Sequence, residues 1–294
     1  MFIMIFVAAL NVEFKDITGL PKLLPVIAAT AFSSLIVRLT IIFISASLLK
    51  DRLDLNTFQN LIVGLSLVSA SPAAPASTAW TRKANGNVTA CLTVYMLTNF
   101  LSPASTPLLL STTSNLITGI FGSEFHKLAS HGSTYFILVN VLLPCIFGLF
   151  ARFIVGEKRV KAAGPSLSFL SLFAMMIAIY ANTSTSLPSI ISHPDYSFLC
   201  LALVLVMILC ASSYANAFIC CNFFKTDKQV RTALMFAGGI NTQSSSLIMA
   251  CTYLPTHPQV VLPLIMCSCI QYIAADIAEI CVADRTTPPQ SGSS

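Results

Sequence analysis

Two polar stretches interrupt apolar segments of this chain, and their residue types could bind an ion or a polar solute. The first covers residues 69–80 and contains Pro72 and Pro75, three residues apart. Each proline removes a backbone donor and clashes with the preceding helical turn, so a helix must open there. The second is a Gly-Gly pair that precedes the polar run 241–246. In a membrane, backbone groups freed by such breaks need partners from protein, water or a bound ion.

Two interpretations of these breaks are open. Small residues and hydroxyl groups also occur where membrane helices pack closely. Alternatively, interruptions at corresponding positions of two halves indicate a transporter site near the bilayer midplane. Each break points the N-terminus of a half-helix toward that site, which favours an anionic group. The presence of two such breaks favours the transporter interpretation.

The elements that position these breaks are predicted to be membrane-spanning helices. The chain has 294 residues, of which 55% are hydrophobic and only 9% are charged. Soluble domains carry about 25% charged residues, so most of this surface must face lipid. The apolar runs are long and continuous, which predicts an all-α polytopic membrane protein rather than a β-barrel. The predicted helical segments are 1–12 (partial), 20–49, 57–81, 87–119, 133–154, 165–183, 197–223, 230–254 and 259–281.

Basic residues predict the orientation of these spans. When the spans alternate, twelve Lys and Arg residues fall on one side, three fall on the other, and Arg38 lies inside a span. The excess predicts that the basic loops and the C-terminus face the cytoplasm, in a plasma or bacterial inner membrane. Arg38 is costly within an apolar segment, and a structural and a functional role are both open.

Several other functions find no support in the sequence. The sequence has no basic stripe with interleaved aromatic residues, which is the pattern expected for nucleic-acid binding. The ten cysteines form no CxxC pair, so no metal site is predicted. No GxSxG, HExxH or phosphate-binding loop appears, which argues against an enzyme.

Motifs around both breaks resemble those of the bile acid:sodium symporter family. In the first half the matching residues, in order, are Pro72, Ala76, Ser77, Gly86, Asn87, Val88, Ser102, Pro103, Thr106 and Pro107. In the second half they are Arg231, Thr232, Gly238 and Asn241, and near the start they are Asn11, Glu13, Phe14, Lys15, Pro21 and Lys22. The resemblance extends from the first residue to about residue 280.

This resemblance implies an inverted-repeat transporter with a core domain, a panel domain and two crossing broken helices. The expected repeats are 1–121 and 133–281, followed by a disordered tail at 285–294. The family's first helix is missing, so the first repeat is expected to be incomplete. The residues expected to contact the substrate are Ser77, Thr78, Asn241, Thr242 and Gln243, with Gln271 at a position that the resemblance places near the site.

The sequence departs from the family at the positions that the resemblance assigns to sodium. These positions are occupied by Thr78, Cys91, Tyr95, Phe236 and Ile240. Phe236 stands where the family has a glutamate, so the carboxylate that would offset the charge of a buried cation is missing. We therefore expect degenerate sodium sites, no bound metal and no cofactor.

The expected function is secondary transport of a small organic anion by alternating access, without the usual sodium sites. The alternative is a degenerate, non-transporting member that serves as a membrane binding or regulatory subunit. The expected partners are the anion and the lipid bilayer, with no nucleic acid, and the sequence does not determine the oligomeric state. Uptake measured with and without a sodium gradient discriminates between the two functions.

Overall fold

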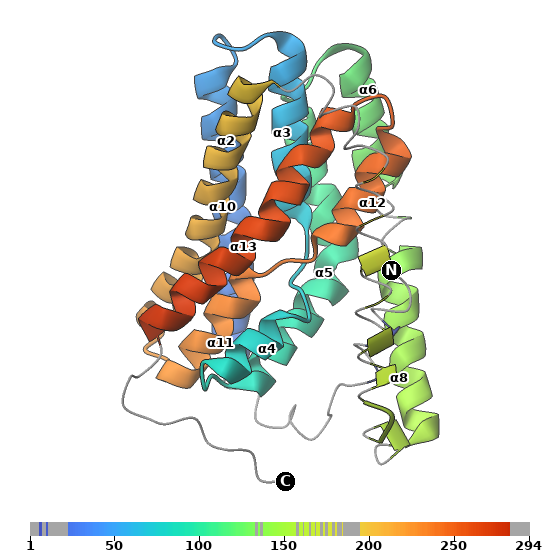
Figure 1. Cartoon of the computed structure of the whole chain (residues 1–294), viewed down its shortest axis with the longest axis vertical. Coiled ribbons are helices and arrows are strands. Elements are labelled where there is room, and N and C mark those ends of the chain that lie inside the picture. The colour runs from blue at the N-terminus through green and yellow to red at the C-terminus, as the bar shows by residue number, and fades with distance from the viewer. Residues whose placement is uncertain are drawn as a thin grey trace.

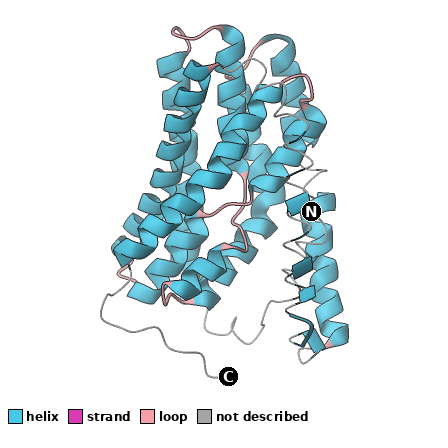
Figure 2. Cartoon of the chain, in the orientation of Figure 1, coloured by secondary structure: helices cyan, strands magenta, loops and turns pink. Residues whose placement is uncertain are grey.

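The computed structural model describes residues 23–132, 138–156 and 195–282, with scattered positions at 6–10, 135 and 159–184. Every regular element in these residues is a helix (Figure 2), which confirms the predicted all-α class. Three of the described helices are long and apolar enough to cross a membrane: Leu24–Leu49, Tyr196–Phe223 and Pro258–Ile280. The chain is therefore an integral membrane protein.

The helices follow the predicted segments closely where the structure describes them. They are α2 Leu24–Leu49, α3 Leu55–Ala70, α4 Ser77–Lys83, α5 Val88–Ser114, α6 Gly119–Lys127, α8 Leu143–Val155, α10 Tyr196–Phe223, α11 Lys228–Gly239, α12 Gln243–Tyr253 and α13 Val261–Val282. Two π-helical turns, η2 Leu128–Gly132 and η3 Leu138–Leu142, and a 3-10 turn, η4 Pro258–Val260, complete the set.

Both predicted interruptions are present. The segment 57–81 divides into α3 and α4, and the segment 230–254 divides into α11 and α12. In Figure 1 the α3–α4 pair and the α11–α12 pair run in opposite directions and meet near the middle of the molecule. This placement brings the four half-helix ends together.

One predicted boundary was wrong. The single span expected over 87–119 ends at Ser114, and a separate helix, α6, begins at Gly119. The chain turns at Gly119, whose φ of +73° is a left-handed conformation that L side chains rarely adopt. Most of the predicted segment 165–183 and all of the tail 285–294 lie outside the described residues.

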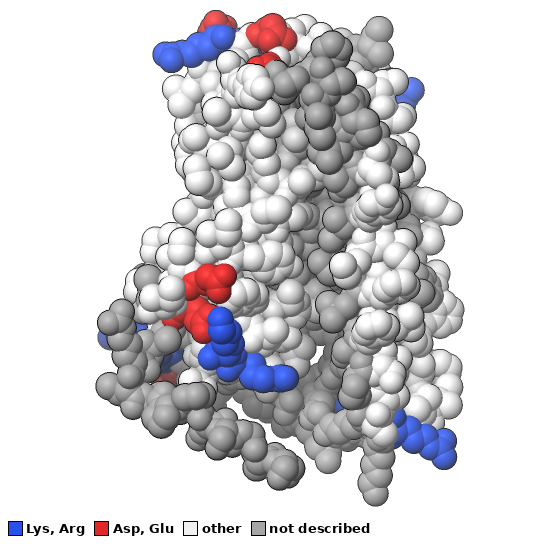
Figure 3. All heavy atoms as spheres, viewed as in Figure 1, with Lys and Arg blue, Asp and Glu red and all other residues white. Residues whose placement is uncertain are grey.

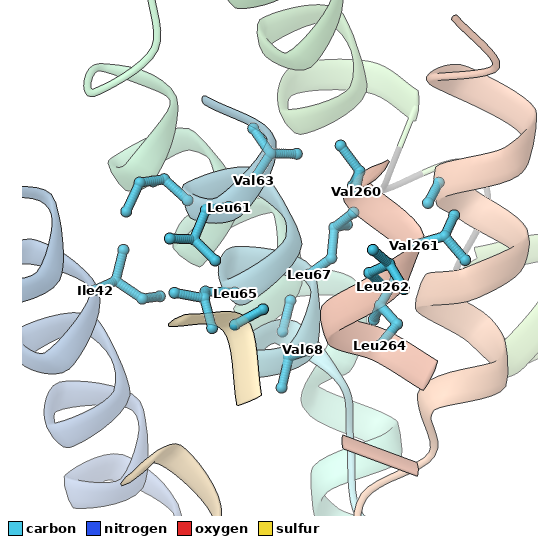
Figure 4. Close-up of a cluster of buried hydrophobic side chains, with 14 of the residues drawn as sticks. Ile42, Leu61, Val63, Leu65, Leu67, Val68, Val260, Val261, Leu262 and Leu264 are labelled. Carbon is cyan, nitrogen blue, oxygen red and sulfur yellow. The ribbon is translucent and has the colours of Figure 1, made fainter. Parts of the chain in front are cut away.

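The helix α3 lies at the centre of the bundle. Thirteen of its 16 residues are buried, and a helix that is buried all round needs partners on every side. Leu61, Leu65 and Val68 of α3 pack in one apolar cluster with Ile42 of α2 and with η4 and α13 (Figure 4). Gly64 allows α3 to lie close to α13, because a Cβ there would lie 2.7 Å from Pro263 Cγ.

Apolar side chains also cover the outside of the bundle. Large hydrophobic residues of α2 and α10 are exposed, and Phe32 reaches 67% exposure. In Figure 3 the charged side chains of the visible face gather in its upper and lower parts, with uncharged atoms between them. An apolar band between charged ends suits a bilayer.

Polar caps fix where three of the helices begin. The side chains of Asp54, Asn87 and Asp195 accept hydrogen bonds from the first turns of α3, α5 and α10 at 3.0, 3.0 and 3.1 Å. Each cap satisfies a backbone N–H group that has no partner inside its helix. The starting points of these helices are thus encoded locally.

Candidate functional site

The two helix breaks meet through their backbones. Ala73 and Asn241 form an isolated antiparallel bridge. The Ala74 N–H group donates to the Ile240 carbonyl at 2.9 Å, and the Thr242 N–H group donates to the Pro72 carbonyl at 2.8 Å. Each break thus supplies partners for backbone groups that the other break leaves free, as a buried site requires.

The side chain of Arg38 on α2 ties together the ends of two half-helices. Its Nη1 donates to the Ser69 carbonyl at 3.0 Å, and its Nη2 donates to the Gly238 carbonyl at 3.2 Å. These carbonyls belong to the last turns of α3 and α11. Each helix C-terminus carries a partial negative charge of about half an elementary charge, so both attract a cation. Arg38 is only 8% exposed, so it faces the protein interior.

One face of α5 satisfies further groups of the first break. The Asn99 amide donates to the Ala73 carbonyl at 3.1 Å, and the Thr106 hydroxyl donates to the Ala70 carbonyl at 3.0 Å. Pro103 cannot donate to the Asn99 carbonyl within α5, and the Ser102 hydroxyl donates to it instead at 2.7 Å. Protein groups therefore provide the partners that the sequence required for the broken backbone.

Ser77 and Thr78 lie at the start of α4, where their hydroxyls bond locally. Ser77 Oγ donates to the Ala74 carbonyl at 2.7 Å, and Thr78 Oγ1 donates to the Pro75 carbonyl at 2.8 Å. These bonds close the turn between the break and α4. Both residues lie beside the first break, as predicted, and their contact with a substrate stays a prediction.

The predicted residues of the second half also help to hold the breaks together. The Gln271 side-chain oxygen accepts the Asn241 N–H group at 3.0 Å, and Thr242 Oγ1 donates to the Ala73 carbonyl at 3.3 Å. The Gln243 side chain accepts from Ser71 Oγ at 3.1 Å and donates to Cys267 Sγ at 3.4 Å. Their predicted roles in substrate binding are likewise still predictions.

A cavity of about 300 Å³ lies beside the crossing of the breaks. Its polar lining includes Arg38, Asn241, Thr98 and Asn216, and most of the remaining lining is apolar. Its wall comes from α2, α5, α10, α11 and the end of α3. Of the six residues predicted to contact a substrate, Asn241 lines this cavity.

The positions assigned to sodium do not suit a sodium ion. Phe236 is 1% exposed and packs between the rings of Trp80 and Tyr214, with ring centroids 6.4 and 6.5 Å away. Ile240 is fully buried, and Cys91 places its sulfur 3.3 Å from Ser77 Oγ. None of the five positions provides a carboxylate. Hard cations bind oxygen ligands, and the side chains at three of the five positions, Cys91, Phe236 and Ile240, carry none.

Two acidic residues near the end of the last helix, Asp276 and Glu279, form ion pairs with Lys83. Lys83 Nζ lies 2.6 Å from Glu279 and 3.8 Å from Asp276, which joins the end of α4 to α13. Lys83 also lies over the Trp80 ring, 4.9 Å from its centroid. These carboxylates therefore bind a basic side chain at the end of the bundle.

Sequence reasoning did not assign Arg38, Asn99 or Asn216 to the site. Asn99, Ser102 and Thr106 recur at helical spacing on one face of α5, and this polar stripe was the available signal. Asn216 bonds to Ser33 Oγ at 3.0 Å, a contact between residues far apart in the sequence. Such a long-range pairing has no sequence signal.

Comparisons with known proteins give one family match and two bacterial relatives. Residues 1–193 match the model of the Sodium Bile acid symporter family. The chain is 27% identical over 214 residues to the uncharacterized protein YbaS of Bacillus subtilis, an alignment that covers 73% of this chain and 66% of YbaS. It is 28% identical over 129 residues to the uncharacterized sodium-dependent transporter YocS of the same organism, covering 43% of this chain and 38% of YocS. The alignments thus cover just under two thirds of one relative and less of the other.

Proposed function

The chain belongs to the Sodium Bile acid symporter family, and from this premise we propose that it is a secondary transporter of a small organic anion. Alternating access would move the anion across the bilayer without the sodium sites expected of the family. The observation that carries this proposal is the cavity at the helix breaks, which contains one buried guanidinium in a mostly apolar wall.

The chemistry of the cavity indicates its substrate class. Arg38 supplies a permanent positive charge, and two of its N–H groups are already bonded to the carbonyls of Ser69 and Gly238. A guanidinium has five N–H donors, so others are available to a carboxylate or sulfonate. An anionic head at Arg38 and an apolar body along α2 and α5 match this lining. The volume of about 300 Å³ is at the small end of ligand sites, which favours a small anion.

The opposite directions of the two broken helices support alternating access. Residues 1–121 and 133–281 would be inverted repeats that form a core and a panel domain, as the family resemblance implies. The site would lie at the midplane, where repeats of such transporters meet. The excess of basic residues on one side places that side and the C-terminus in the cytoplasm under this proposal.

Uptake by the purified protein in liposomes tests the proposal. A panel of radiolabelled small carboxylates and sulfonates is offered, and at least one is expected to accumulate by counterflow. Ser105→Trp fills the cavity and is expected to abolish this uptake. Thr112 lies on the same helix but does not line the cavity, so Thr112→Trp is expected to retain the uptake.

The alternative function has one observation in its favour. Phe236 and Ile240 are buried in apolar packing at two positions assigned to sodium, as expected for a member that binds but does not transport. Folded, monodisperse protein that shows no counterflow of any anion offered would overturn the transport proposal. Anion binding without transport would then indicate a binding or regulatory subunit.

A further inference from the structure

Arg38 occupies a position that suits a bound cation. In transporters with broken helices, the C-terminal ends of half-helices and the carbonyls of the unwound segments hold the coupling cation. Here the same kinds of group, the Ser69 and Gly238 carbonyls, accept hydrogen bonds from one guanidinium. The positive charge at the breaks is therefore carried by a side chain of α2 and not by a bound ion.

The charges around this guanidinium balance without an acidic residue. Two helix C-termini contribute about half a negative charge each, which together match the single positive charge of Arg38. In the part of the chain that the structure describes, no carboxylate forms an ion pair with Arg38. The described acidic residues are Asp51, Asp54, Glu124, Asp195, Asp227, Asp276 and Glu279. The half-helix ends are thus the groups that stabilise the buried charge.

A second cation would be disfavoured at the same place. Arg38 and Asn241 line one small cavity with Cys210 and Cys267, so the guanidinium reaches the second break itself. Repulsion between two unit charges about 4 Å apart in a partly shielded site weakens binding on the order of a thousandfold. The positions assigned to sodium supply no carboxylate that could offset this repulsion.

We propose that Arg38 is a built-in replacement for the coupling cation. It holds the ends of α3 and α11 together permanently, so the folded site requires no sodium and substrate uptake is independent of a sodium gradient. The statement about uptake rests on the proposed transport function, whereas the statement about cation binding does not.

Thermal unfolding of the purified protein tests the replacement directly. Sodium chloride is varied at constant ionic strength against N-methyl-D-glucamine chloride. The Tm of the wild type and of Arg38→Lys is expected to be insensitive to sodium, because both keep a fixed charge. Arg38→Ser exposes the two carbonyls to a mobile ion, and saturating sodium is expected to raise its Tm by roughly 2–4 °C.

The comparison of variants separates this role from a purely structural one. A residue needed only for packing would make the Lys and Ser variants equally unstable, with no response to sodium. That result would overturn the proposal, and so would a wild-type Tm that rises with sodium. If Arg38→Ser does not fold, binding of radioactive sodium is measured on the wild type and Arg38→Gln. Binding is expected only to Arg38→Gln, and binding to the wild type or to neither protein contradicts the proposal.

Uptake in liposomes distinguishes the two proposals from each other. Equal uptake by the wild type with and without a sodium gradient is the expected result. Uptake that needs the gradient contradicts the replacement of the cation but leaves anion transport intact. A third outcome is that no uptake occurs, while the Tm of the wild type is insensitive to sodium and the Tm of Arg38→Ser depends on it. That outcome contradicts only the transport function.

Discussion

Ala73 and Asn241 face each other as a non-hydrogen-bonded pair, because the two hydrogen bonds of their bridge join the residues on either side. The Cα atoms of such a pair lie about 4.5 Å apart, with their side chains on the same face. This bridge is one of the contacts that join the two helix breaks, and its geometry can be tested by cross-linking.

Cysteines at these two positions are expected to form a disulfide, because the spacing lies within the range of about 4.4–6.8 Å that a disulfide requires. The test uses Ala73→Cys with Asn241→Cys in a chain that carries Cys210→Ala and Cys267→Ala. The native sulfurs of Cys210 and Cys267 lie 3.7 Å apart and would compete. Mass spectrometry of peptides after mild oxidation detects the bond.

The matched control for this cross-link is Ala74→Cys with Asn241→Cys. Successive residues of an extended segment point to opposite sides, so this pair should remain reduced. Equal cross-linking of both pairs would contradict the bridge.

Gly239→Ala is expected to destabilise the protein, because a Cβ at this position would overlap the Tyr214 ring. Overpacking of this kind costs about 1–3 kcal/mol. Gly238→Ala is the control, since its Cβ would meet its nearest atom, Ala217 Cβ, at an ordinary 3.6 Å. Thermal unfolding in detergent compares the two variants. The double variant Gly239→Ala with Tyr214→Ala should recover part of the lost stability. If it recovers none, the clash with the Tyr214 ring is not the cause of the loss.

Gln271→Met is expected to lower the stability of the folded protein rather than only its affinity for a substrate. The substitution keeps the length of the side chain but removes the oxygen that accepts the Asn241 N–H group. An unsatisfied buried N–H group costs about 1–3 kcal/mol. Cys269→Met, at an exposed position of the same helix, is the control. An unchanged Tm with a raised KM for uptake would instead support direct substrate contact by Gln271.

Asp54→Ala is expected to lower stability at neutral pH by about 1 kcal/mol, because it removes the N-terminal cap of α3. The Thr57 N–H group donates to this carboxylate and lowers the pKa of Asp54 below its ordinary value. A lowered pKa in the folded state contributes stability above the unfolded value of about 3.9 and loses it as the pH falls through the folded value.

The difference in Tm between the wild type and Asp54→Ala should therefore narrow at acidic pH. Asp54→Asn keeps an oxygen that can accept from the Thr57 N–H group, but this side chain does not titrate. The difference in Tm between Asp54→Asn and Asp54→Ala should therefore persist at acidic pH. A constant difference between the wild type and Asp54→Ala from neutral to acidic pH would argue against the cap.

The sequence by itself determined the helical class, the three long apolar helices that the structure describes and the positions of the two breaks. Their causes are local: the prolines at 72 and 75 cannot donate to the preceding turn, and the polar run 241–246 cannot face lipid. The absence of a carboxylate at the positions assigned to sodium was equally visible. Side-chain chemistry and covalent geometry act over a few residues, so these features can be predicted without a fold.

Only the tertiary structure decided which groups satisfy the broken backbones. Arg38 bonds to carbonyls 31 and 200 residues further along the chain, and Asn241 bonds to a side chain 30 residues away. Such partners depend on how α2, α3, α11 and α13 pack together, and no short-range pattern encodes that packing. The sequence left the role of Arg38 open for this reason, and the structure places its charge between the two half-helix ends.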